Sequence, residues 1–155
     1  MLRTLYDNPI AFSLRDGDGI VNQPLEHRFP LERYRLQCYA IENALLTDSC
    51  LAVMDTTWEG LVTAATKWAK DNPSHSDITL IEELFRSVDR LRHKKIKKIR
   101  QLICAIVGCK KPWEVVVGQA IGALTEKDLE NSNMLIDFLG SDMVSNIILR
   151  DATNK

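Results

Sequence analysis

The fold is predicted most directly by one stretch of the chain, residues 88–107, which reads VDRLRHKKIKKIRQLICAIV. On a helix with about 100° per residue, its lysines project from one side and its aliphatic side chains from the other. The aliphatic set comprises Val88, Ile96, Ile99, Leu102, Ile103, Ile106 and Val107. Arg92 and Lys95 fall within the aliphatic arc, which favours a break near residues 91–94 over one continuous helix. The stretch predicts a basic amphipathic helix with a break near its start.

The flanking sequence extends the helical pattern in both directions. Apolar residues recur at spacings of three and four over residues 30–45, 51–69, 78–91 and 126–149, and turn-forming residues separate these runs. Thr125 and Asp128 have the spacing of a capping box, and Gly108 and Gly140 are typical helix stops. Three consecutive valines leave residues 113–124 open between helix and strand. We expect an all-α fold, a single compact bundle-like domain of six or seven helices.

The two ends of the chain look different from its middle. Residues 1–29 are predicted to be an irregular N-terminal arm, in which residues 15–19 form a turn. That turn would connect a small hairpin, or the arm would pack as extended chain over the helices. Residues 30–150 form the expected helical domain, and residues 151–155 a polar tail.

Composition narrows the class of protein further. Hydrophobic residues make up 45% of the chain, and there are only seven glycines and five prolines, which is typical of a helical globular domain. The sequence shows neither a signal peptide nor an apolar run long enough to cross a membrane. We expect no membrane partner and a cytoplasmic location, with nuclear entry as an alternative, because residues 94–97 fit a short basic import signal.

Charge is distributed unevenly along the chain. Residues 90–111 hold nine basic side chains and no acidic one, although the net charge of the whole protein is −1. The remaining sequence therefore carries 11 basic and 21 acidic residues. Such a local excess of cations predicts an anionic partner.

Lysines at helical spacing suit nucleic acid, because a row of cations can neutralise successive phosphates and release counterions. No zinc-finger, helix-turn-helix or ribonucleoprotein motif is present, so contacts would be mainly to the backbone. The sequence predicts a non-enzymatic regulatory protein that binds nucleic acid, with RNA favoured. The predicted binding residues are Arg90, Arg92, Lys94, Lys95, Lys97, Lys98, Arg100, Lys110, Lys111 and Trp113, the last as a stacking or anchoring ring. The alternative is a protein-interaction module or homo-oligomer that uses the basic face and the apolar C-terminal helix toward an acidic or identical partner.

No chemistry is indicated beyond binding. The sequence lacks a glycine-rich phosphate loop, a nucleophile elbow and a paired acid and base, so we expect no enzyme and no cofactor. Cys104 and Cys109 would lie about 140° apart on a helix and so make poor joint metal ligands, and residues 16–19 hold only part of a calcium loop. We expect no metal site and buried free thiols. In general layout alone, the chain resembles viral accessory or transcription-cofactor domains.

Overall fold

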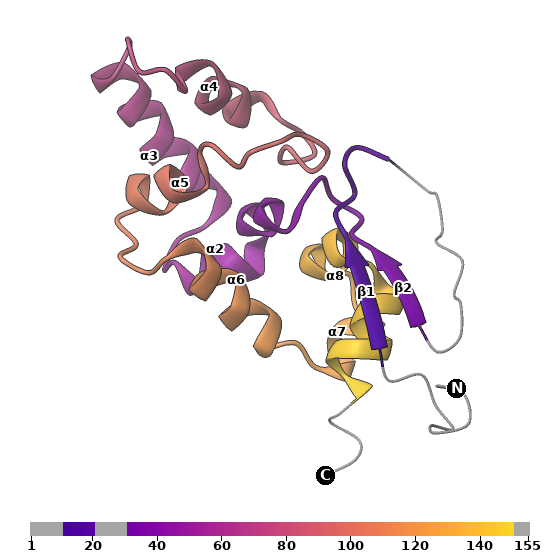
Figure 1. Cartoon of the computed structure of the whole chain (residues 1–155). Helices are drawn as coiled ribbons and strands as arrows, with labels where there is room; N and C mark the ends of the chain where they lie inside the picture. The colour runs from indigo at the N-terminus through magenta and orange to yellow at the C-terminus, as the bar shows by residue number, and fades with distance from the viewer. Residues whose placement is uncertain (1–10, 21–30, 151–155) are drawn as a thin grey trace, which may run out of the picture.

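The computed structural model describes residues 11–20 and 31–150, which are mostly helical. Figure 1 shows two short strands beside one end of a set of short helices. In chain order the elements are β1 (Ala11–Arg15), β2 (Leu31–Arg35), η1 (Ile41–Leu46), α2 (Asp48–Val53), α3 (Trp58–Asp71), α4 (Ile78–Arg86), α5 (Arg100–Ile106), α6 (Trp113–Gly122), α7 (Glu126–Glu130), α8 (Met134–Leu139), α9 (Ser141–Met143) and η2 (Val144–Ile148). The helices are shorter and more numerous than the six or seven that the sequence predicts.

The all-α prediction is wrong in one respect, because β1 and β2 form a two-stranded parallel sheet. Ala11 pairs with Leu31, and the register continues to Arg15 opposite Arg35. The helix predicted from residue 30 is therefore a strand at its start. Tyr34, Leu36 and Cys38 are buried at alternate positions, the period of a strand, although Leu31, Tyr34 and Cys38 also fit the helical spacing.

The N-terminal arm is ordered where it contacts the segment after β2. Within the described part of the arm, β1 pairs in parallel with β2 and Ile20 is not in a strand, so the predicted hairpin is not formed there; residue 21 lies outside the described residues. Beyond the strands, the Leu36 amide donates to the Arg15 carbonyl at 2.9 Å, and the Asp18 amide to the Tyr39 carbonyl at 2.9 Å. Gly17 lies between them, where a Cβ would stand 2.0 Å from the Cys38 carbonyl oxygen. Only glycine allows this close approach of the two chains.

The centre of the core is formed by η1 and α2. Five consecutive side chains, from Asn43 to Thr47, are fully buried there, as are Cys50 and Leu51. Helices α6 and α8 pack against this centre, and α3 and α4 pair at the end of the molecule remote from the sheet (Figure 1). The core therefore joins residues from both halves of the chain.

The later helices agree with the local signals in the sequence. Residues 113–122 form a helix, which settles the choice left open by the valines. Asp128 accepts hydrogen bonds from the Thr125 amide at 2.7 Å and its hydroxyl at 2.8 Å, so the capping interaction at α7 is confirmed. Gly108 and Gly140 have φ values of +73° and +101°, as expected for helix stops.

The last helical segment belongs to the core. Met143, Val144 and Leu149 are buried, and Ile147 and Ile148 pack against the core cluster. Three of its apolar side chains are therefore covered within the chain, and Ile147 and Ile148 are partly covered.

Candidate nucleic-acid interface

The basic stretch begins as an irregular loop rather than as a helix. Helix α4 ends at Arg86 and α5 begins at Arg100, so the predicted basic helix exists only from residue 100 onward. The predicted break is present, but it extends over residues 87–99, which we call the lysine loop. Arg90 and Leu91 both have φ +52°, a left-handed conformation that two consecutive non-glycine residues rarely adopt. A continuous helix would have buried Arg92 and Lys95, whereas this turn buries Leu91 and leaves Val88 fully exposed.

One buried amide holds the strained turn in place. The Asn43 side chain, with no solvent exposure, donates to the Leu91 carbonyl at 2.7 Å and to the Lys94 carbonyl at 2.8 Å. Its oxygen accepts from the Ala40 amide at 3.0 Å, so both ends of the side chain are used. The Tyr39 amide adds a bond to the Arg92 carbonyl at 2.7 Å. The lysine loop is thus fixed to η1 and to the segment that precedes it.

Ile96 and Ile99 anchor the second half of the lysine loop in the core. Ile96 is 1% exposed and Ile99 is fully buried, whereas Lys95, Lys97 and Lys98 around them are exposed. In this half of the lysine loop the isoleucines therefore face the core and the lysines face solvent, as the sequence predicts. The backbone that separates them is a loop and not the predicted helix. The predicted import signal at residues 94–97 includes the buried Ile96.

The three arginines of the predicted site contact the protein itself. Arg90 pairs with Asp48 at 2.6 Å, donates to the Leu46 carbonyl at 3.1 Å and lies 4.6 Å from the Trp58 ring centre. Arg100 pairs with Glu42 at 2.7 Å. Their guanidinium groups connect the lysine loop and the start of α5 to η1, α2 and α3.

Arg92 has the same role at the middle of the lysine loop. Its guanidinium donates to the Gln37 carbonyl at 2.8 Å and to the Asp137 carbonyl at 2.5 Å, and lies 5.3 Å from the centre of the Phe138 ring. A planar group with several donors can bridge two carbonyls while stacking on a ring. Arg92 therefore ties the lysine loop to α8.

The lysines are the exposed part of the predicted site. Lys94 pairs with Glu83, and both side chains are partly exposed. Lys95, Lys98 and Lys110 make no hydrogen bond or ion pair with any residue of the described ranges. Lys97 lies within electrostatic reach of Asp16; burial and the nearby Glu42 raise the pKa of Asp16, and Lys97 lowers it.

Lys110, Lys111 and Trp113 follow α5 in the chain. A seven-residue helix is about 10 Å long, so Lys110 and Lys111 come after the opposite end of α5 from Lys97 and Lys98. Lys111 donates to the side-chain oxygen of Gln119 at 3.1 Å and more weakly to the Val53 carbonyl. The Trp113 ring is half-buried, with the Arg100 guanidinium 4.9 Å from its centre. The lysines of the predicted site are therefore divided between the two ends of α5, whereas the Trp113 ring lies beside Arg100 at the start of this helix.

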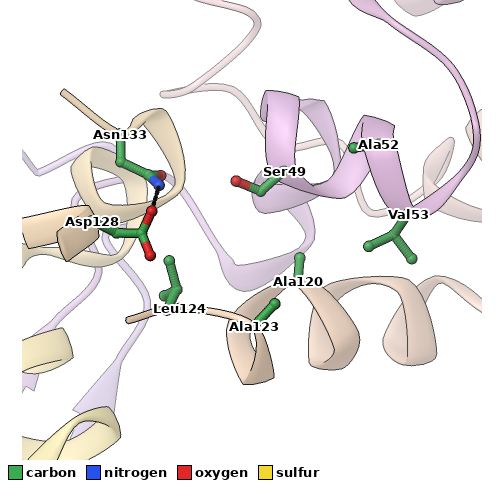
Figure 2. Close-up of a pocket in the computed structure, with 8 residues that line it drawn as sticks. All are labelled: Ser49, Ala52, Val53, Ala120, Ala123, Leu124, Asp128 and Asn133. Carbon is green, nitrogen blue, oxygen red and sulfur yellow. Dashed lines mark hydrogen bonds between the residues drawn. The ribbon is translucent and has the colours of Figure 1, made fainter. Parts of the chain in front are cut away.

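A concave region lies between α2, the end of α6, and the segment that runs from α7 to the start of α8 (Figure 2). This open pocket has a volume of about 360 Å³, and small side chains form much of its wall. It is lined by Ser49, Ala52, Val53, Ala120, Ala123, Leu124, Asp128 and Asn133. Its one carboxylate, Asp128, also accepts from the Asn133 amide at 3.2 Å, as Figure 2 shows, in addition to its capping bonds. These hydrogen bonds lower the pKa of Asp128.

The pocket therefore presents no acid and base in position for catalysis, since its carboxylate is occupied in holding the start of α7. Among the residues with described positions, no group of three or more metal-binding side chains comes together. No described helix is long and apolar enough to span a bilayer.

Sequence reasoning missed the two residues that position the basic surface, Glu42 and Asn43. Both lie in a segment that the sequence assigned to an ordinary core helix. A buried asparagine has no spacing pattern of its own, and its partners are carbonyls about 50 positions away in the sequence. Only the tertiary structure brings them together.

No family model, curated protein or solved structure matches this chain.

Proposed function

We propose that this chain is a non-enzymatic regulatory protein that binds RNA through phosphate contacts from Lys95, Lys97, Lys98 and Lys110. The observation that carries the proposal is the separation of roles within the basic stretch. Its arginines are engaged inside the protein, whereas these four lysines are exposed and three of them have no partner among the residues described. Unneutralised ammonium groups on a fixed support attract a polyanion with little loss of conformational freedom.

The shape of the surface favours RNA over duplex DNA. A protein that reads DNA usually inserts a helix or ribbon into the major groove. Here the lysines precede and follow α5, which is only seven residues long, and the loop itself is irregular. A short lysine loop can follow the phosphates of a flexible strand without entering a groove. The contacts carry no sequence information, so we expect weak sequence preference.

Fluorescence anisotropy with a labelled single-stranded RNA tests the proposal. The triple variant Lys95→Ala, Lys97→Ala, Lys98→Ala should bind roughly tenfold or more weakly, and the slope of log affinity against log salt should flatten by about 2. The matched control is Lys67→Ala, Lys70→Ala, Lys127→Ala, which removes the same charge from exposed sites elsewhere. Equal affinity of both triple variants for RNA would refute the proposed surface.

A parallel titration with polyglutamate separates an acidic protein partner from RNA. A phosphate-binding surface should prefer RNA at equal salt, and duplex DNA should bind more weakly than the single strand. If the protein binds polyglutamate more tightly than RNA, its partner is an acidic polypeptide and the RNA proposal is wrong.

A further inference from the structure

The end of α5 brings two cysteines together that the helical spacing separates. The Cys109 amide donates to the Cys104 carbonyl at 2.9 Å, and the Gly108 amide to the Ala105 carbonyl at 3.0 Å. Gly108 between them is left-handed, with φ +73°. These two bonds and the left-handed glycine define a Schellman motif, in which the side chains of the first and last residues commonly touch. Here those two residues are Cys104 and Cys109.

The expectation that five positions keep these thiols on different sides of a helix is therefore wrong. The helix ends at Ile106, and the chain turns back so that Cys109 packs against the core beside Cys104. The hydrogen bond from the Cys109 amide to the Cys104 carbonyl brings the two backbones together, and Cys109 lies close enough to Cys104 to influence its pKa. Disulfides need this kind of proximity, with Cα separations of about 4.4–6.8 Å.

The two thiols also differ in access to solvent. Cys104 is fully buried and Cys109 is partly exposed, and both are free thiols. Burial, with a smaller contribution from the nearby Cys109, raises the pKa of Cys104 to about 11. Cys104 therefore remains protonated and shielded, whereas Cys109 can meet a small reagent from solution.

We infer that Cys104 and Cys109 form a dithiol modification site that a hydroperoxide converts to an intramolecular disulfide. In the first step, the Cys109 sulfur attacks the peroxide oxygen, the O–O bond breaks, and an alcohol, or water from hydrogen peroxide, leaves. Cys109 becomes a sulfenic acid. In the second step, the Cys104 sulfur attacks the Cys109 sulfur, the S–O bond breaks, and water leaves with the thiol proton. Two thiols are oxidised by two electrons, and the peroxide is reduced.

The chain offers a direct readout of this reaction. Trypsin cleaves after Arg100 and Lys110 and releases residues 101–110, which contain both thiols, whereas Cys38 and Cys50 share residues 36–67. The folded protein is treated with hydrogen peroxide, unfolded, alkylated and digested for mass spectrometry. We expect peptide 101–110 to lose two hydrogen atoms and resist alkylation, while peptide 36–67 is alkylated at both cysteines. Alkylation of both thiols in 101–110, or sulfinic acid at Cys109, would overturn the inference.

Two variants test the geometry separately from the reactivity. In Cys104→Ser, the sulfenic acid at Cys109 has no resolving thiol, so dimedone should label it, whereas the wild type should remain unlabelled. In Gly108→Ala both thiols stay, but a left-handed alanine is strained, so disulfide formation should slow several-fold. Gly118→Ala, in open space on α6, is the matched control and should react like the wild type. Equal dimedone labelling of wild type and Cys104→Ser, or an unchanged rate in Gly108→Ala, would contradict the proposed alignment.

Discussion

At the scale of single residues, the basic stretch contains two kinds of cation with different roles. The arginines have fixed partners within the protein, because a guanidinium can donate to carbonyls and lie on an aromatic ring simultaneously. The lysines carry compact, strongly hydrated charges and stay in solvent. Charge counting along the sequence treats both kinds alike, so it predicts the location of the basic surface but overstates the number of available cations.

Asn43 is the residue on which the lysine loop most depends. Asn43→Ala leaves the buried Leu91 carbonyl, the partly buried Lys94 carbonyl and the Ala40 amide without their partner. We expect the free energy of unfolding to fall by about 2–3 kcal/mol, because unpaired buried polar groups lose their hydration without compensation. Urea unfolding followed by circular dichroism measures this change.

The control for that prediction is Asn131→Ala. Asn131 is exposed and bonds only to the Lys127 carbonyl among the described residues, so its loss should change stability by no more than about 0.5 kcal/mol. Equal losses in both variants would show that Asn43 does not have this special role.

At the scale of elements, each end of α5 places different residues. Its start follows a loop whose isoleucines are buried and whose lysines are exposed, and its end closes in the Schellman turn. The helical wheel correctly places Ile96, Ile99 and Ile103 on the buried side of this stretch, but it is wrong about Val88, which is fully exposed. It is wrong about the backbone, because the left-handed turn at residues 90–91 depends on hydrogen bonds from distant segments.

A matched pair of substitutions distinguishes residues that hold the lysine loop in place from residues that bind RNA. Arg90→Ala should lower the free energy of unfolding by about 1–2 kcal/mol, since it removes bonds to Asp48 and the Leu46 carbonyl and the contact with Trp58. Lys95→Ala should change stability by less than about 0.5 kcal/mol and should instead weaken RNA binding. Thermal unfolding and anisotropy measured on both variants check this. The reverse ranking in stability would mean that the arginine does not tether the lysine loop.

At the scale of the whole molecule, the core contains buried thiols from both halves of the chain. Burial raises the pKa of Cys38 to about 12, and the pKa values of Cys50 and Cys104 to about 11. Each thiol stays protonated in the folded state up to a higher pH than in the unfolded chain, where the pKa of a thiol is near its ordinary value of 9.0. The contribution of these buried thiols to the free energy of unfolding is therefore fully present below about pH 9. It is lost as the pH rises through the folded-state pKa values of about 11 to about 12.

We expect unfolding in urea, with a reductant present, to become easier above about pH 9, by up to about 1.4 kcal/mol per pH unit for each thiol. Cys50→Ala removes one of these groups, so its stability should decline less steeply with pH than that of the wild type. Parallel pH profiles of the two proteins would contradict the assignment of this loss to buried thiols.

The sequence by itself determined the local features of this protein. The start of α7 at Thr125, the stops at Gly108 and Gly140 and the exposure of the lysines all follow from interactions between neighbouring residues. Only the tertiary structure decided that residues 31–35 form a strand and that the lysine loop is not helical. The strand and the loop depend on partners far away in the chain: a second strand, a buried amide, and carboxylates and carbonyls from other helices. The turn that brings Cys109 back toward Cys104 is local, but a helical wheel does not represent its geometry.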